Sequence, residues 1–97
     1  MGGETSDDVL RSIIPKDTPN SFVPTSTIKE GYKYGFDVNG KKMEIKWHSQ
    51  DLNAMIKYPN SNSGTGWTAQ IKVGRKLLGQ DGIFYKKPSN LTHIPMK

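Results

Sequence analysis

Two runs of alternating apolar and polar residues stand on either side of Asn39-Gly40. Asn-Gly between two such runs is typical of a two-residue type I′ β-hairpin. A two-residue loop pairs Val38 with Lys41, and this register places six apolar side chains on one face: Tyr32, Tyr34 and Phe36 opposite Trp47, Ile45 and Met43. The pattern therefore predicts a hairpin over residues 32–48 whose apolar face belongs to the core.

The other face of this hairpin is predicted to be polar. The same register sets Lys33 opposite Lys46, Gly35 opposite Glu44, Asp37 opposite Lys42, and His48 near Gly31. Directly opposed like charges are unfavourable, so the pairing of Lys33 with Lys46 needs a compensating negative charge. Neighbouring Glu44 and Asp37 can supply it, and so can a bound phosphate, and the two explanations are compatible.

Alternation returns over residues 66–73 and predicts a third strand. Its inward positions are Trp67, Ala69, Ile71 and Val73, and its outward positions are Thr68, Gln70 and Lys72. Further short strands are expected at 77–78 and 83–85, on either side of the turn residues 79–82. A terminal edge strand is expected at Thr92–Ile94, ended by Pro95.

A short helix is predicted near the start of the chain, because Ser6-Asp7-Asp8 precedes four apolar positions, Val9, Leu10, Ile13 and Ile14, and Pro15 follows. Residues 16–30 read as an irregular arm anchored by Phe22 and Val23, and residues 51–65 as a long polar loop. The predicted fold is α+β, with one N-terminal helix packed on a twisted antiparallel sheet of four or five strands. Residues 6–97 are expected to form the single domain, and residues 1–5 a linker or expression remnant.

Composition narrows the class of protein. The 97 residues suffice for one domain, and 14 Lys plus Arg against 9 Asp plus Glu give a formal net charge of +5. This charge attracts polyanions, although a merely soluble surface explains it equally well. The chain has no cysteine, which excludes disulfides, thiolate nucleophiles and cysteine zinc sites. No apolar run approaches the roughly 20 residues of a membrane-spanning helix, so no membrane anchor is expected.

The candidate chemistry lies with two histidines. His48 and His93 are each surrounded by polar residues, and an imidazole pKa of about 6.5 suits proton transfer at neutral pH. Nucleotide-binding glycine loops and the hydrolase nucleophile elbow do not occur in the sequence. Two histidines far apart in the chain, with only Asp51 nearby, give little support to a metal site, so neither a metal nor another cofactor is expected.

Acid–base cleavage of RNA requires a base for the ribose 2′-hydroxyl, an acid for the leaving 5′-oxygen, and cations around phosphorus. The two imidazoles can transfer the protons, and several other side chains can bind phosphate, hydroxyls or an unpaired base: Lys33, Lys46, Lys86, Lys87, Arg75, Thr92, Ser61 to Thr65, Tyr58, Tyr85 and Trp67. Each also has an ordinary explanation, because strand histidines and lysines commonly lie on a solvated surface.

The order of several segments carries a resemblance: Ile13–Lys16, Gly35–Asp37, His48 three residues before Asp51 and six before Ala54, Asn62-Ser63 before Gly66-Trp67, Gly74–Leu77, and Thr92–Pro95. This series resembles the C-terminal toxin domain of bacterial polymorphic toxins of type 30, over about Ile13 to Met96. The matching polar positions are His48, Asp51, Ser63, Arg75, Thr92 and His93. The chain departs at Ser49-Gln50, where a Gly-Pro pair is expected, so the turn that aims His48 is not defined by the likeness.

The resemblance implies a ribonuclease toxin that is secreted as part of a larger effector and acts in the cytoplasm of a competing bacterium. It also implies a cognate immunity protein, which we expect to be acidic because it must cover a cationic site. The free domain is expected to be a monomer.

We therefore predict a metal-independent endoribonuclease with His48 and His93 as base and acid, in an order left open. Lys46 is predicted to stabilise the pentavalent phosphate, while Thr92 and Arg75 hold its oxygens. Further substrate contacts are predicted for Lys33, Asp51, Ser63, Tyr85 and Lys86. Two alternatives stay open: a non-enzymatic module that binds nucleic acid or protein, and a toxin that acts on DNA or on a nucleotide such as NAD.

Overall fold

A long β-hairpin forms the centre of the domain. The computed structural model describes residues 5–96, and in it β1 (Gly31–Val38) pairs antiparallel with β2 (Lys41–His48). The register is the predicted one, from Val38 opposite Lys41 at the turn to Gly31 opposite His48 at the far end. Asn39 and Gly40 have φ values of 51° and 81°, as a type I′ turn requires.

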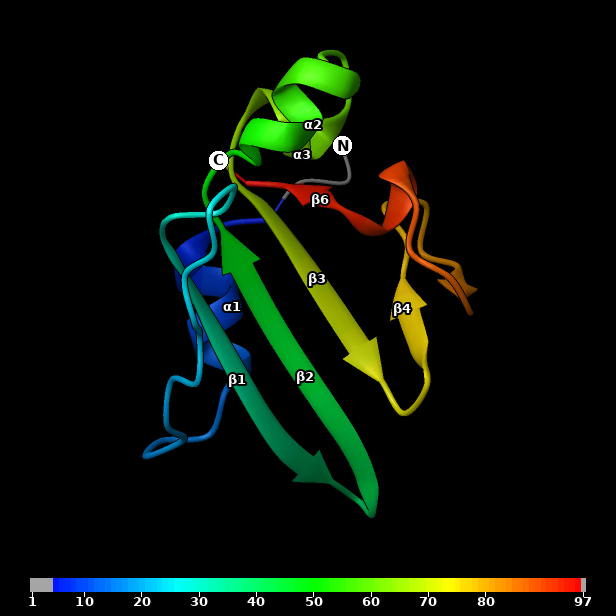
Figure 1. Cartoon of the computed structure of the whole chain (residues 1–97). Helices are drawn as coiled ribbons and strands as arrows, with labels where there is room; N and C mark the ends of the chain where they lie inside the picture. Colours follow the sequence, from blue (N-terminus) through cyan, green and yellow to red (C-terminus); the bar gives the residue numbers. More distant parts are fainter. Residues whose placement is uncertain (1–4, 97) are drawn as a thin grey trace.

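Four further strands extend this hairpin into one antiparallel sheet (Figure 1). They are β3 (Thr68–Val73), β4 (Lys76–Leu78), β5 (Phe84–Tyr85) and β6 (Ile94–Pro95). The order is β1-β2-β3-β4-β5, and β6 pairs with the first two residues of β3. The α+β class and the short strands at 77–78 and 83–85 are confirmed.

The core lies between the sheet and α1 (Asp7–Ile13), which covers one face of the sheet (Figure 1). Ser6 caps α1, and its hydroxyl accepts a hydrogen bond from the Val9 amide. Leu10 is fully buried, but Val9 and Ile13 are 52% and 46% exposed. Of the four apolar residues of the predicted helix, Leu10 and Ile14 therefore pack in the core, because a helix of two turns presents only a narrow face to the sheet.

Trp47 connects this helix to the sheet. Its Nε1 donates to Asp7 Oδ1 at 2.9 Å, and the Arg11 guanidinium lies over the rings of Tyr32 and Trp47, at 4.7 and 5.4 Å from their centroids. The other buried members of the core are Tyr34, Ile45 and Ala69. Because α1 covers this face, the opposite face of the sheet is left to polar residues.

Residues 51–65 form two short helices rather than the predicted loop: α2 (Leu52–Lys57) and α3 (Asn62–Thr65). Asp51 accepts from two amides of the first turn of α2, and Ser61 accepts from the Gly64 amide in α3. A Cβ at Gly64 would come within 2.7 Å of the Tyr58 carbonyl oxygen, so glycine allows the two helices to pack closely. Side-chain caps therefore begin both helices, and the close packing of the two helices holds the segment in place.

Residues 16–30 contain no helix or strand and follow the free edge of β1, as predicted for an arm. The Ser21 amide donates to the Lys33 carbonyl at 2.9 Å, and Phe22 lies against Gly31. Val23 is 75% exposed and does not anchor the arm.

Three other predictions at strand ends need correction. Trp67 precedes β3 and is 36% exposed, so it lies at the edge of the core and is not buried in it. Asn90–Thr92 is a 3₁₀ turn, η1, and only Ile94 and Pro95 belong to the terminal strand. Thr5 pairs with Met96, so it belongs to the domain, while the rest of the predicted remnant, residues 1–4, lies outside the described residues. No described helix is long and apolar enough to cross a membrane.

Candidate active site on the open face of the sheet

The sheet face opposite α1 carries a continuous polar surface. Neighbouring strands pair His48 with Thr68, Lys46 with Gln70, and Glu44 with Lys72. Since alternate residues of a strand point to the same side, these six side chains share one face. On β4, Leu77 lies opposite Lys72 and extends this surface.

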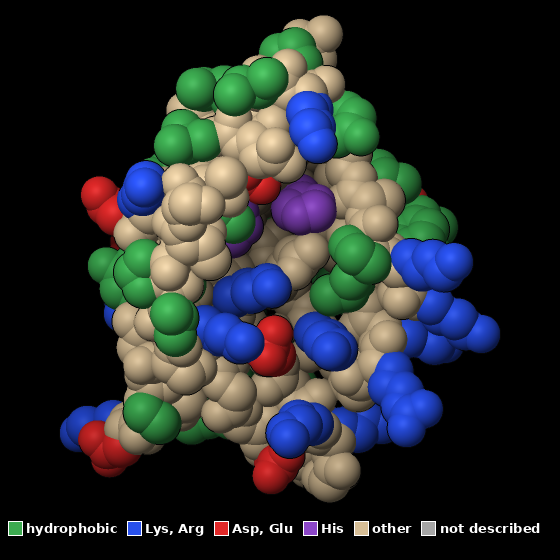
Figure 2. Space-filling model, viewed as in Figure 1, with side chains coloured by type: hydrophobic (Ala, Val, Ile, Leu, Met, Phe, Trp, Pro, Cys, Tyr) green, Lys and Arg blue, Asp and Glu red, His purple; other side chains and the backbone are tan. Residues whose placement is uncertain are grey.

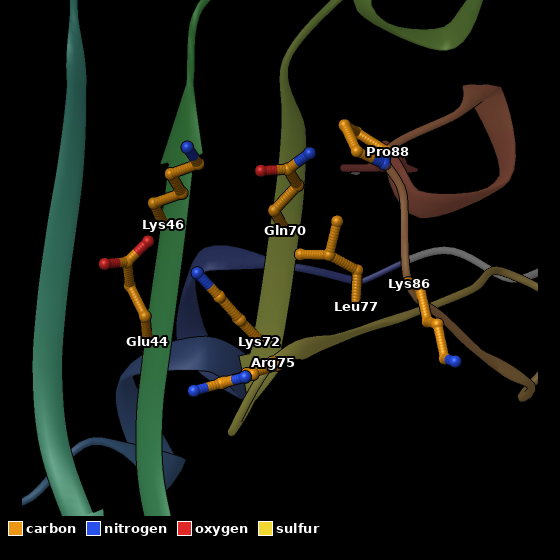
Figure 3. Close-up of a pocket in the computed structure, with 8 residues that line it drawn as sticks. All are labelled: Glu44, Lys46, Gln70, Lys72, Arg75, Leu77, Lys86 and Pro88. Carbon is orange, nitrogen blue, oxygen red and sulfur yellow. The ribbon is translucent and has the colours of Figure 1, made fainter.

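A cationic cleft lies in this surface. It has a volume of about 250 Å³ and is lined by four cationic side chains, one carboxylate and three others: Lys46, Lys72, Arg75, Lys86, Glu44, Gln70, Leu77 and Pro88. Figure 3 shows Lys46, Gln70 and Lys72 rising from β2 and β3 into the cleft, with Lys86 directed away from its floor. Figure 2 shows both histidines at one end of a hollow whose other side chains include several lysines and arginines. The excess of positive charge suits an anionic ligand.

His48 ends β2 and is only 9% exposed. Its Nδ1 lies 2.8 Å from the Ser49 carbonyl oxygen. A carbonyl oxygen only accepts, so Nδ1 carries the proton and Nε2 is the nitrogen that can take up another. Burial lowers the pKa of His48, and the positive charges of His93 and Lys46 lower it further. His48 is therefore a neutral proton acceptor at neutral pH.

His93 follows η1 and is oriented in the same way. Its Nδ1 lies 2.7 Å from the Ser89 carbonyl oxygen, so Nε2 is again the free nitrogen. This Nε2 is 3.5 Å from Nε2 of Gln70, which lines the cleft. The charge of His93 also acts on His48. Neither histidine is among the lining residues of the cleft, but the two, far apart in the sequence, lie near one another at one end of the hollow in Figure 2.

The turn after His48 is well defined although Ser49-Gln50 departs from the expected Gly-Pro pair. The Ser49 amide donates to the Glu30 carbonyl at 2.9 Å, and the Ser49 hydroxyl accepts from the Glu30 amide. Gln50 Nε2 donates to the Gly64 carbonyl at 2.6 Å. These bonds attach the turn to the arm and to α3, and they hold the carbonyl oxygen that orients His48.

Lys33 lies beside the cleft but is not among its lining residues. Its Nζ is 3.9 Å from Glu44 Oε2, with both side chains partly exposed. Of the two explanations for the opposed lysines, the structure shows neutralisation by a neighbouring acid. Among the other predicted phosphate contacts, Lys46, Arg75 and Lys86 all line the cleft.

Thr92 does not fit the predicted contact with phosphate. It is fully buried, its hydroxyl donates to the Ser89 carbonyl at 3.0 Å, and it accepts from the Ser89 amide at 2.9 Å. Both functions of the hydroxyl are used inside the turn. Thr92 holds Ser89, whose carbonyl in turn orients His93.

Two further predicted substrate contacts have structural partners away from the cleft lining. Asp51 caps α2 through its Oδ1, at 2.9 Å from the Asn53 amide. The Tyr85 hydroxyl donates to the Asp81 carboxylate, which raises the pKa of Tyr85 and lowers that of Asp81. Among the proposed stacking residues, Trp67 lines a depression with Tyr32 and Trp47, on the side of α1.

Ser63 lines a second cavity rather than the cleft. This cavity has a volume of about 420 Å³ and adjoins α2, α3 and η1, with eight lining residues: Ala54, Tyr58, Ser61, Ser63, Pro88, Ser89, Asn90 and His93. It shares Pro88 with the cleft, and His93 stands between the two.

Gln70 and Lys72 were not predicted as site residues. Their outward position on the third strand was predicted, but the sequence did not show that β3 lies beside β2. Pairing of Ile71 with Ile45 sets Gln70 next to Lys46. The alternation of β3, read together with that pairing, is the signal that could have found them.

Within residues 5–96 no group of three or more His, Asp or Glu side chains is arranged to hold a metal ion. Comparison of the chain with family models, with curated protein sequences and with solved structures finds no match.

Proposed function

We propose that this domain is an endoribonuclease that cleaves RNA by transesterification. The observation that supports this most is the pair of imidazoles beside the cationic cleft, each with Nδ1 bonded to a backbone carbonyl and with Nε2 not bonded to the backbone. Two imidazoles of defined tautomer beside a phosphate-binding surface are what acid–base cleavage requires.

The burial of His48 supports its assignment as the general base. Its lowered pKa keeps it neutral, so Nε2 can take the proton from the ribose 2′-hydroxyl. His93 is more exposed and acts as the acid in its doubly protonated form, in which Nε2 also carries a proton and donates it to the leaving 5′-oxygen. Nε2 of Gln70 lies 3.5 Å from this nitrogen.

The attacking 2′-oxygen forms a bond to phosphorus while the bond from phosphorus to the 5′-oxygen breaks. The products are a 2′,3′-cyclic phosphate and a free 5′-hydroxyl. His48 gains one proton and His93 loses one, so the total number of protons on the pair is unchanged. Lys46, Lys72 and Arg75 balance the charge that develops on the phosphate oxygens. This scheme uses no metal ion.

The histidines provide the direct test. His48→Gln and His93→Gln keep side-chain size but remove the proton transfers, so each is expected to lower the rate of RNA cleavage by about 10²- to 10⁴-fold. The measurement is single-turnover cleavage with and without EDTA, followed by analysis of the ends for cyclic phosphate. Lys16→Ala, on the exposed arm, serves as a control.

The midpoint of thermal unfolding of each variant must stay close to that of the parent, so that a lower rate reflects lost chemistry rather than lost folding. Undiminished cleavage by either glutamine variant contradicts the assignment. Salt-sensitive RNA binding without new RNA ends supports a binding module instead, and cleavage of DNA or of a nucleotide supports a different substrate.

We further propose the biological setting that the toxin resemblance implies. In it the domain is delivered as part of a secreted effector, and an acidic immunity protein neutralises it in the producing cell. The cleft is the surface that such a partner would cover, since carboxylates can occupy the place of phosphate among Lys46, Lys72 and Arg75.

A further inference from the structure

The second cavity lies where a bound RNA strand would leave the cleft. Pro88 lines both, and His93 lines the cavity while its Nε2 approaches Gln70 in the cleft. A chain whose phosphate lies beside His93 therefore has its next nucleoside at the mouth of this cavity.

Tyr58 gives the cavity an aromatic surface. Its side chain is 66% exposed, while its backbone is held by two hydrogen bonds, from its amide to the Ala54 carbonyl at 2.7 Å and from the Ser61 hydroxyl to its own carbonyl at 2.6 Å. An exposed ring on a fixed backbone is suited to stacking an unpaired base. Ala54 and Pro88 add apolar surface.

The polar groups of the cavity are oriented by a network centred on Asn62. Asn62 donates from its amide to Asn90 Oδ1 at 2.8 Å, and from Nδ2 to the carbonyl oxygens of Asn90 and His93 at 3.2 and 3.0 Å. Because Asn90 Oδ1 is occupied, its Nδ2 donors are the part of the amide left for a ligand. Together with the Ser63 hydroxyl they can donate to a carbonyl oxygen on a base edge.

We propose that this cavity binds the nucleobase on the 3′ side of the cleaved bond in unpaired RNA. The assignment rests on the proposed function: His93 as the acid protonates the 5′-oxygen of the leaving nucleoside, whose base is the one nearest the cavity. Donors in the cavity favour bases with a carbonyl oxygen, so adenine, which has none, is disfavoured at this position.

The test compares two substrates of different length. One is a ribodinucleoside monophosphate, and the other is the methyl ester of the same 3′-nucleotide, whose leaving group carries no base. Tyr58→Ala is expected to reduce the ratio of kcat/KM for the dinucleotide to that for the methyl ester by about tenfold. Tyr58→Phe keeps the stacking surface and is expected to keep the ratio, and so is Ile56→Ala, an 81% exposed residue of the same helix.

An unchanged ratio of kcat/KM in Tyr58→Ala overturns the proposal, even if kcat/KM falls equally for both substrates, because the cavity then does not bind the 3′ base. A parent that cleaves adenine at this position as well as the other bases contradicts the donor assignment.

Failure of the proposed function is recognised separately. Binding of a dinucleotide without the attacking 2′-hydroxyl is measured by titration to the parent and to Tyr58→Ala, and about tenfold weaker binding by the variant is expected. If the parent cleaves no RNA but this difference remains, the nuclease function is wrong and the cavity is still a nucleobase site. If the parent and Tyr58→Ala bind the dinucleotide equally, the cavity assignment fails whether or not the domain cleaves RNA.

Discussion

At the scale of single residues, the candidate site depends on two backbone carbonyls. The oxygens of Ser49 and Ser89 each accept from Nδ1 of a histidine, at 2.8 and 2.7 Å, and so decide which nitrogen of each ring is free. A carbonyl is present at every residue, so the sequence cannot show which one a histidine will meet. The two histidines could be predicted as candidate residues from the sequence, but the tautomer of each ring is set by the fold.

If the domain cleaves RNA as proposed, the pH dependence of cleavage follows from His48. Because its pKa lies below the ordinary value of 6.5, the neutral base persists until the pH falls through that lowered pKa. We expect kcat/KM to decrease on the acidic side with a midpoint below 6.5, measured with a dinucleotide substrate and compared with the NMR titration of the His48 ring. An acidic midpoint above 6.5 that follows His48 contradicts its role as a buried neutral base.

The same shift affects stability. Between the folded and unfolded pKa values of His48 the unfolded chain binds more protons, so the free energy of unfolding rises with pH through this range. The contribution of His48 to the free energy of unfolding is complete above about pH 6.5, the ordinary pKa of histidine. It is lost as the pH falls through the pKa of His48 in the folded protein. His48→Gln should remove this part of the pH dependence.

At the scale of elements, short helices held by side-chain caps position the polar groups. Asp51 begins α2, Ser61 begins α3, and the reciprocal bonds of Ser89 and Thr92 close η1. Such caps are local and were visible as residue types, but Pro59 and many turn-forming residues favoured a loop over residues 51–65. Tertiary hydrogen bonds, such as that from the Asp51 amide to the Ser63 carbonyl at 2.8 Å, stabilise the helical conformation instead.

Two buried threonines offer a matched test of these elements. Thr92→Val removes both bonds to Ser89 and is expected to lower the free energy of unfolding by about 1–3 kcal/mol. Thr68 is 1% exposed, and its hydroxyl has no hydrogen-bond partner among the described residues. Thr68→Val should therefore leave the free energy unchanged or raise it by about 1 kcal/mol.

Urea unfolding of both variants measures these changes. If Thr68→Val lowers the free energy of unfolding as much as Thr92→Val does, the Thr68 hydroxyl has a hydrogen-bond partner, such as a buried water.

At the scale of the whole molecule, the sheet separates the hydrophobic core from the cationic cleft. The face under α1 contains the core, and the opposite face contains the cleft, so substitutions in the cleft are expected to have little effect on core packing. Charge is also unevenly distributed, because the cleft combines four cationic side chains with one carboxylate.

This distribution can be separated from net charge by two equal charge reversals. Lys72→Glu in the cleft and Lys16→Glu on the arm change the net charge by the same amount. If the cleft binds RNA, Lys72→Glu reduces the slope of log affinity against log salt by about 0.7 for each lost phosphate contact, whereas Lys16→Glu leaves it near the parent value. Anisotropy titrations of a single-stranded RNA with the inactive His48→Gln protein as background provide the measurement.

An equal reduction of this slope in Lys72→Glu and Lys16→Glu would mean that net charge alone attracts RNA. The same pair of variants distinguishes a partner that covers the cleft from one that binds elsewhere, because only Lys72→Glu should weaken the former.

The sequence by itself determined the hairpin register, the core face of β1 and β2, the polar face with Lys46 and His48, and the α+β class. These are local consequences of alternation with a period of two and of an Asn-Gly turn. Only the tertiary structure decided that β3 adds beside β2, that His93 lies near His48, and that Thr92 is buried. Such placements depend on contacts between residues far apart in the chain, which no local pattern records. The two histidines are a pair because β6 pairs with the start of β3, next to the end of β2.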